Sequence, residues 1–290
     1  MTTKLEKAKP RIISAMEDSK GVFTLRELQQ LIHSSRVAWD LAHSTKVTEV
    51  LDLLQADGRL RKLTLRAQYY SPFVRYIWGE VSAYRLAASI WKRGYLTHGS
   101  AVFLHGLTNE IPKTVYLNKE QSAKPVSRGG LTQERIDMAF SRAQRTSSYV
   151  LTVGEYQVVL LSGKQTGRLE VGELPDPEGK GTVPATLLER TLIDIAVRPN
   201  YAGGVPHVLD AFRGALDRVR VPLLVATLKR LDYVYPYHQS VGFLLERAGL
   251  EAKRLEALRT IGIEFDFHLA HGMREKDYDS RWRLFFPKGL

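Results

Sequence analysis

The chain has 290 residues, and 42 Lys and Arg against 31 Asp and Glu give a formal net charge of +11 at pH 7. A hydrophobic fraction of 44% and a charged fraction of 25% are typical of a globular protein and exclude a disordered or fibrous one. The sequence contains no cysteine, which excludes disulfides and thiolate metal sites, and no apolar stretch approaches bilayer-spanning length. We expect a cytoplasmic protein with no membrane partner, and the basic excess predicts a polyanionic partner.

Three helical patterns and a hairpin pattern follow one another in the first eighty residues. The second helix begins at Thr24, because Thr24 and Glu27 match a capping box, and the third begins near Val47. The hydrophobic period then changes to two across residues 62–78, which predicts an antiparallel hairpin. This order is that of a winged helix-turn-helix domain, which we expect over residues 1–80.

Such a module inserts its third helix into the major groove of DNA while its hairpin follows the phosphate backbone. The candidate readers on and before the third helix are Ser44, Thr45, Lys46, Thr48 and Glu49. The hairpin region carries five basic residues and no acidic one, namely Arg59, Arg61, Lys62, Arg66 and Arg75. We therefore predict that the hairpin binds phosphates. The alternative is an ordinary small domain whose cations only solvate an outer strand face.

Residues 81–290 mix both periods, so the predicted fold class is α+β, with a larger mixed α/β C-terminal domain after the winged helix. The predicted strands are residues 114–118, 148–153, 156–162, 168–173 and 282–286. The predicted helices are a stretch around residues 84–91, a short helix near residues 100–105, and residues 132–143, 186–197, 205–216, 222–231 and 240–248. An exposed Pro/Gly loop is expected over residues 175–181.

A second basic stretch follows in this C-terminal part. Its cations are Lys113, Lys119, Lys124, Arg128, Arg135, Arg142 and Arg145, and spacing places the last three on one side of the predicted helix. This stretch is either a second phosphate-binding surface or an ordinary solvated face, and the sequence leaves both open.

Signatures of an enzyme are weak. Asp176, Glu178 and Lys180 have the residue types of a nuclease site but crowd one loop, whereas such carboxylates need fixing on adjacent strands. Acidic and histidine side chains near the C-terminus, Asp266, His268, His271, Asp277 and Asp279, lack a compact metal-ligand spacing. No phosphate-binding loop, dinucleotide fingerprint or nucleophile elbow is present. We predict no catalytic residue, metal or cofactor, with a nuclease-like enzyme targeted by a winged helix, or an adaptor that holds a toxin directly, as alternatives.

Two sequence blocks, residues 95–116 and 187–204, resemble those of a known protein family. They read YLTHGSAVFLHGLTNEIPKTVY, and LLERTLID followed by RPNYAGG. With the N-terminal pattern, these blocks resemble the AbiEi-type antitoxin family of type IV toxin–antitoxin systems. From the residues alone, Arg190 and Asp194 read as a surface ion pair at i and i+4.

The resemblance implies a sequence-specific transcriptional repressor in the bacterial cytoplasm that binds inverted repeats of double-stranded DNA in its own promoter. It implies a C-terminal domain that supports antitoxicity and assists DNA binding. The implied functional partner is a nucleotidyltransferase-type toxin, opposed without a stable complex. One departure is the segment between the second and third helices, residues 33–43, which is longer than a tight helix-turn-helix turn.

Overall fold

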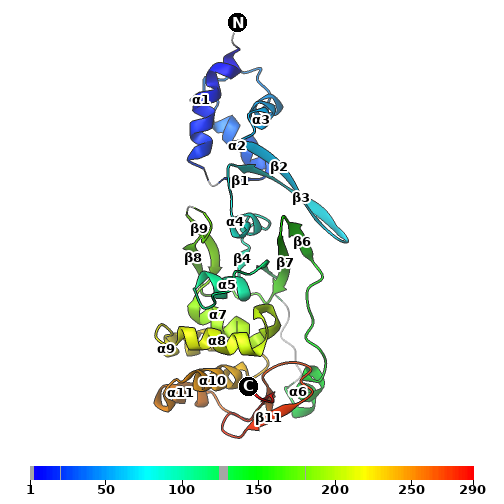
Figure 1. Cartoon of the computed structure of the whole chain (residues 1–290), viewed down its shortest axis with the longest axis vertical. Helices are drawn as coiled ribbons and strands as arrows, with labels where there is room; N and C mark the ends of the chain where they lie inside the picture. The colour runs from blue at the N-terminus through cyan, green and yellow to red at the C-terminus, as the bar shows by residue number, and fades with distance from the viewer. Residues whose placement is uncertain (1–2, 20, 124–129, 180) are drawn as a thin grey trace.

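The computed structural model describes residues 3–19, 21–123, 130–179 and 181–290. Figure 1 shows an elongated molecule, with the N-terminal helices at one end, the C-terminal helices at the other and a curled mixed sheet between them. This combination of helices and strands confirms the α+β class. Within the described residues no helix is long and apolar enough to cross a membrane.

Three helices and three strands form the N-terminal end. The predicted capping box is confirmed, because the Thr24 backbone N–H donates to Glu27 Oε2 at 2.7 Å and the Glu27 N–H donates to Thr24 Oγ1 at 3.2 Å. These elements enclose a core that includes Ile12, Leu28 and Leu54. Their bounds are α1 Lys4–Glu17, β1 Val22–Phe23, α2 Leu25–Ser35, α3 Val47–Ala56, β2 Leu60–Ala67 and β3 Tyr70–Trp78.

One nine-stranded sheet runs from this end into the rest of the chain, in the order β1-β3-β2-β6-β7-β5-β4-β9-β8. The junction is the antiparallel pairing of Ala67 in β2 with Leu151 in β6. The β5–β7 and β4–β9 pairs are parallel, and the other pairs are antiparallel. The remaining strands are β4 Tyr95–Leu96, β5 Thr114–Glu120, β6 Val150–Val153, β7 Tyr156–Gly163, β8 Val171–Pro175 and β9 Thr182–Thr186.

Helices cover the sheet and build the far end of the molecule around the largest core cluster. Gly242 is required there by close approach, because a Cβ would lie 2.2 Å from the fully buried ring of Trp282. The helices are α4 Ala83–Ala88, α5 Gly99–Leu104, α6 Gln133–Phe140, α7 Leu188–Val197, α8 Val205–Ala215, α9 Val221–Leu231, α10 Tyr237–Ala248 and α11 Ala252–Arg259. A 3-10 turn, Pro199–Ala202, and a small sheet of β10 Phe267–His268, β11 Lys276–Asp279 and β12 Leu284–Pro287 complete the fold.

The structure differs from the predicted elements at several places. The helix expected over residues 132–143 ends at Phe140, and β1, β4, β9, β10, β11 and α11 were not predicted. The predicted exposed Pro/Gly loop connects β8 to β9 as the turn of a hairpin, and its described residues are exposed except Asp176, which is buried. Short strands whose burial comes from distant segments leave little periodicity to find.

Candidate nucleic-acid interface

Both faces of the β2–β3 hairpin pack against other parts of the protein. The strand register shows which side chains lie on each face. Leu60 pairs with Trp78, and both belong to the core of the N-terminal helices. Leu65 and Ile77 point to the opposite face and pack in a second core with Tyr84 of α4. Because side chains alternate along a strand, the register decides which hairpin cations face which side.

Lys62, Thr64 and Arg66 lie on the face that packs against the N-terminal helices, beyond the point where those helices end. Lys62 is paired with Tyr76 and Thr64 with Val74, both of which contact the N-terminal core. All three side chains are exposed, and among the described residues neither Lys62 nor Arg66 has an ion-pair partner. This face therefore presents cations that are free to bind phosphates.

Arg59 and Arg61 lie at the base of the hairpin, where nearby carboxylates partly neutralise their positive charge. Arg59 contacts Glu17 Oε1 at 3.1 Å and Asp57 Oδ2 at 3.2 Å, and Arg61 lies 3.8 Å from Glu80. Both arginine side chains remain about half exposed. Ion pairs this exposed contribute little to stability, so both arginines can exchange their carboxylates for phosphates.

Arg75 does not fit its predicted role as a phosphate contact. It is 6% exposed, and its guanidinium donates to the carbonyl oxygens of Ser89 and Ile90, at 2.7 Å and 2.8 Å from Nη2. Burial lowers the pKa of Arg75, and the charge of Glu27 acts in the opposite direction. The side chain joins β3 to the C-terminal end of α4. Arg75 is therefore not available as a phosphate contact.

The predicted base-reading residues at α3 also differ in exposure. Ser44, Lys46 and Thr48 are exposed, whereas Thr45 is 9% exposed, which corrects its assignment as an outward residue. Glu49 is exposed, but its carboxylate accepts the Lys46 backbone N–H at 3.1 Å. Lys46 and Thr48 therefore remain the best candidate readers.

Arg36 stabilises the long segment between α2 and α3. Its guanidinium donates to the carbonyl oxygens of Ala42 at 2.5 Å, His43 at 3.3 Å and Thr45 at 2.9 Å. These bonds hold the segment in one conformation up to the residue before Lys46, and so position the start of α3. No residue pattern in the sequence predicts this role of Arg36, because its hydrogen bonds run to backbone carbonyls.

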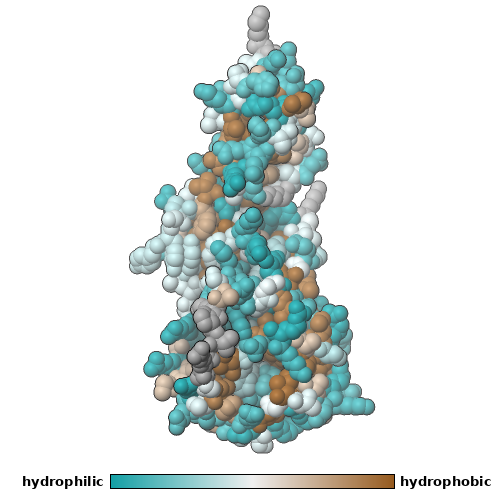
Figure 2. Space-filling model, turned by 180° about the vertical axis from the view of Figure 1, so that it is seen from behind, coloured by the Kyte–Doolittle hydropathy of each residue, from teal (hydrophilic) through white to brown (hydrophobic). Residues whose placement is uncertain are grey.

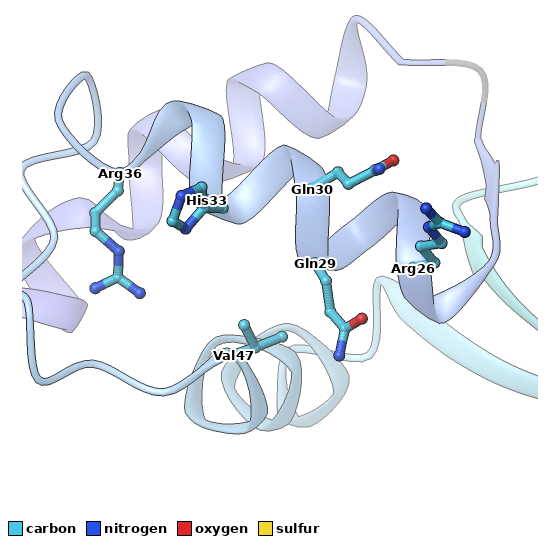
Figure 3. A pocket seen from close by; sticks show the side chains of 6 residues that line it. All are labelled: Arg26, Gln29, Gln30, His33, Arg36 and Val47. Carbon is cyan, nitrogen blue, oxygen red and sulfur yellow. The ribbon is translucent and has the colours of Figure 1, made fainter.

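A groove of about 420 Å³ lies between α2 and the start of α3. Figure 3 shows Gln29 of α2 and Val47 of α3 pointing toward one another across it, with Arg26 and Arg36 at its two ends. The remaining lining residues are Gln30 and His33. Guanidinium and amide groups are the side chains that pair with guanine and adenine edges. The signal for these residues was the polar face of an amphipathic helix.

The described cations of the second basic stretch do not gather into one surface. Lys113 pairs with Glu155 at 3.2 Å, and Lys119, near the other end of β5, lies over the Trp91 ring at 5.9 Å. Arg135 is on α6, at the end of the molecule opposite the N-terminal helices (Figure 1), and Arg142 follows that helix instead of lying on it. The candidates Lys124 and Arg128 lie outside the described residues.

The acidic groups of the enzyme alternative have structural partners. Asp176 accepts hydrogen bonds from Ser82 Oγ at 2.8 Å and Arg85 Nε at 3.2 Å, and Glu178 accepts one from the Tyr156 hydroxyl at 2.9 Å. Asp176 thereby ties the β8–β9 turn to the start of α4. Across the described ranges no group of three or more His, Asp or Glu side chains is placed to hold a metal ion.

The Arg190–Asp194 pair is buried, which corrects its interpretation as a surface pair. Arg190 Nε lies 2.8 Å from Asp194 Oδ1, both side chains are under a tenth exposed, and Asp194 Oδ2 accepts the Thr97 hydroxyl at 2.9 Å. Arg190 also donates to Thr166, whose hydroxyl donates to Glu120. The two sequence blocks of the resemblance therefore meet in one buried polar network.

His98 lies beside this network. Its Nδ1 is buried with no hydrogen-bond partner in the part of the chain that the structure describes, and its ring makes an edge contact with Tyr201 at 5.3 Å. Burial lowers the pKa of His98 to about 4, opposed by the charge of Asp194. His98 is therefore neutral at pH 7.

Comparisons with known proteins show the fold and nothing finer. The RV2827C protein from Mycobacterium tuberculosis has a similar solved structure, with a TM-score of 0.57, at 16% sequence identity over 96% of this chain and 91% of that chain. No protein-family model matches the chain. No curated protein matches it either. The shared architecture thus extends over nearly the whole chain, N-terminal end included.

Proposed function

We propose that residues 1–80 form a winged helix-turn-helix domain and that the protein is a sequence-specific DNA-binding regulator. The observation that carries the proposal is the free cationic face of Lys62 and Arg66, which lies on the helix side of the hairpin. The order α1, β1, α2, α3, β2, β3 supports it, because a reading helix followed by a hairpin is the arrangement such domains use.

In this proposal the hairpin supplies affinity and α3 supplies specificity. Lys62 and Arg66 bind phosphates regardless of sequence, because their contacts are electrostatic. Lys46 and Thr48 read base edges, and Gln29 contributes from the groove between α2 and α3. Arg36 acts through its three carbonyl contacts and is a positioning residue.

The resemblance of residues 95–116 and 187–204 extends the proposal to biology: an antitoxin that represses its own operon and opposes a nucleotidyltransferase-type toxin. The buried network of Arg190, Asp194 and Thr97 supports treating these two blocks as one structural unit. Growth of cells that express the neighbouring gene product, with and without this chain, tests the antitoxin role. Equal growth arrest in both would contradict it.

The DNA-binding role is tested by fluorescence anisotropy on the duplex upstream of the reading frame, against a scrambled duplex, across a salt series. A specific regulator keeps a preference of roughly a thousandfold or more at physiological salt. Thr48→Ala should reduce that preference by roughly 1–3 kcal/mol, the value of one base contact. Equal and weak binding of both duplexes would refute the proposal.

A further inference from the structure

A cavity of about 260 Å³ lies where α9 ends and α10 begins, at the end of the molecule opposite the N-terminal helices (Figure 1). Three tyrosines at alternate positions line it, Tyr233, Tyr235 and Tyr237. The other lining residues are Leu228, Lys229, Asp232, His238 and Ile261. Figure 2 shows that hydrophobic side chains reach the surface of this end of the molecule in several places, separated by hydrophilic ones.

The three tyrosine rings stand at steep angles to one another. The Tyr237 ring makes an edge contact with Tyr233, with centroids 5.3 Å apart and planes at 77°, and with Tyr235 at 6.1 Å and 79°. Tyr235 and Tyr237 also pack on Phe267, and Tyr235 makes an edge contact with Phe140 at 5.3 Å. The packing on these two phenylalanines fixes the rings before any ligand arrives, so the aromatic wall is preorganised.

The hydroxyl groups of these tyrosines are not used by the protein itself. Within the described part of the chain, none of the three hydroxyls donates or accepts a hydrogen bond. Tyr237 is nevertheless only 8% exposed, and the hydroxyl of a buried tyrosine usually has a partner. Burial raises the pKa of Tyr237 to about 12 and also raises the pKa of Tyr233, so both hydroxyls keep their protons at pH 7. Each of these hydroxyls can therefore donate a hydrogen bond to a ligand and accept one from it.

The charges that line the cavity balance one another. Lys229 and Asp232 are both exposed, and neither forms an ion pair with another described residue. The nearby ammonium group of Lys164 donates to two carbonyl oxygens at the end of α9, so its charge stabilises that helix end. Burial lowers the pKa of His238, which is therefore neutral at pH 7. This balance favours a ligand without net charge.

We propose that this cavity binds a nucleobase. A nucleobase is planar and packs on tyrosine rings, carries several hydrogen-bond donors and acceptors on its edge, and has no charge at pH 7. The volume of about 260 Å³ is just below the range of roughly 300–1,000 Å³ that larger ligands occupy, which suits one ring system with a small substituent. The inference does not rest on DNA binding, because the cavity lies at the far end of the molecule from α3 and the β2–β3 hairpin.

The first experiment is isothermal titration calorimetry of the full chain with adenosine, cytidine, guanosine and uridine. At least one nucleoside should bind one to one with a Kd of roughly 100 µM or tighter, the affinity expected for about twenty non-hydrogen atoms. Ribose 5-phosphate, which has a sugar and a phosphate but no base, should not bind. A single-stranded tetranucleotide of the preferred base identifies the source: tighter binding than the nucleoside indicates a base within a strand, and equal or weaker binding indicates a free nucleoside.

The second experiment removes hydroxyls and keeps the rings, in the double variant Tyr235→Phe with Tyr237→Phe. Its affinity for the preferred nucleoside should fall roughly tenfold, the scale of one or two lost hydrogen bonds. Tyr70→Phe is the matched control, because the Tyr70 ring stacks on Tyr149 outside the cavity, and it should bind within about twofold of wild type. None of these hydroxyls has a partner in the described chain, so all variants should unfold at the wild-type urea concentration.

Three results would overturn the inference. The first is that none of the four nucleosides binds. The second is that the double variant binds the nucleoside as tightly as wild type and Tyr70→Phe do. The third is that ribose 5-phosphate binds as tightly as the nucleoside, because the protein would then recognise the phosphate and not the base. A wild-type protein that prefers no duplex in the anisotropy experiment would refute the proposed function and leave this inference standing.

Discussion

The two basic stretches of the chain have a similar excess of positive charge, five basic and no acidic residues in 59–75 and seven basic and three acidic residues in 113–145, but different arrangements in space. Residues 59–75 fold into one hairpin, whose register places Lys62 and Arg66 together on an exposed face. The described cations of residues 113–145 are separated in space, with Lys113 before β5 and Arg135 on α6 at the far end of the molecule. A run of cations becomes a binding surface only when a short element brings them to one side.

The contrast also exists inside the hairpin. Arg66 and Arg75 lie on neighbouring strands of the same motif, yet Arg66 faces solvent and Arg75 donates to buried carbonyl oxygens. Strand alternation and the packing of α4 against one face explain the difference. Three predictions test this contrast.

The largest expected effect is on stability, from Arg75→Met. Loss of the guanidinium leaves the carbonyl oxygens of Ser89 and Ile90 without their donor, and we expect the free energy of unfolding to fall by about 3 kcal/mol. Urea unfolding followed by circular dichroism measures it. Arg66→Met on the exposed face is the matched control, with a change within about 0.5 kcal/mol. Equal losses in both variants would contradict the assignment of Arg75 as a structural residue.

The second prediction extends the contrast between buried and exposed groups to histidine and pH. The folded pKa of His98 is lowered to about 4 by burial. Between pH 6.5 and 4 the unfolded chain therefore binds a proton at His98 that the folded chain does not bind. The contribution of His98 to the stability of the folded state is thus complete above pH 6.5 and is lost as the pH falls. From this group we expect roughly 2 kcal/mol less stability at pH 5 than at pH 7.

His98→Gln should flatten this dependence in unfolding curves of the variant and of wild type measured at the two pH values. His105, His238 and His271, whose pKa values are also lowered mainly by burial, supply the slope that remains. A His98→Gln slope identical to wild type would show that this ring is solvated in the folded protein.

The third prediction separates the two basic stretches directly on DNA. Lys62→Ala with Arg66→Ala should weaken binding to all duplexes roughly tenfold and reduce the salt slope by about two, one for each phosphate contact. Arg135→Ala with Arg142→Ala removes the same charge from the far end and should leave the slope unchanged. Anisotropy titrations from low to high salt compare the two double variants. A slope that falls equally in both would mean that overall charge, and not the hairpin face, drives binding.

Local patterns predicted much of the N-terminal end correctly. The Thr24–Glu27 capping box, the start of α3 near Val47 and the alternation in β2 depend on neighbours within a few residues, so the sequence displays them. Most helices after residue 186 were also predicted within a few residues of their bounds, because each has a continuous apolar face. The winged-helix assignment and the domain boundary at residue 80 remain predictions.

Contacts between distant segments decided what local patterns could not show. Arg75 reads like Arg66 until α4 covers it, and Asp176 reads like a loop carboxylate until Ser82 and Arg85 meet it. The strand β9 gains its place from β4 and β8, which lie on either side of it. Composition can be counted directly, and helical periodicity and helix caps depend on residues within a short window. These features can therefore be recognised in the sequence alone. Burial of a charge and the gathering of cations depend on which segments meet, and only the folded chain brings those segments together.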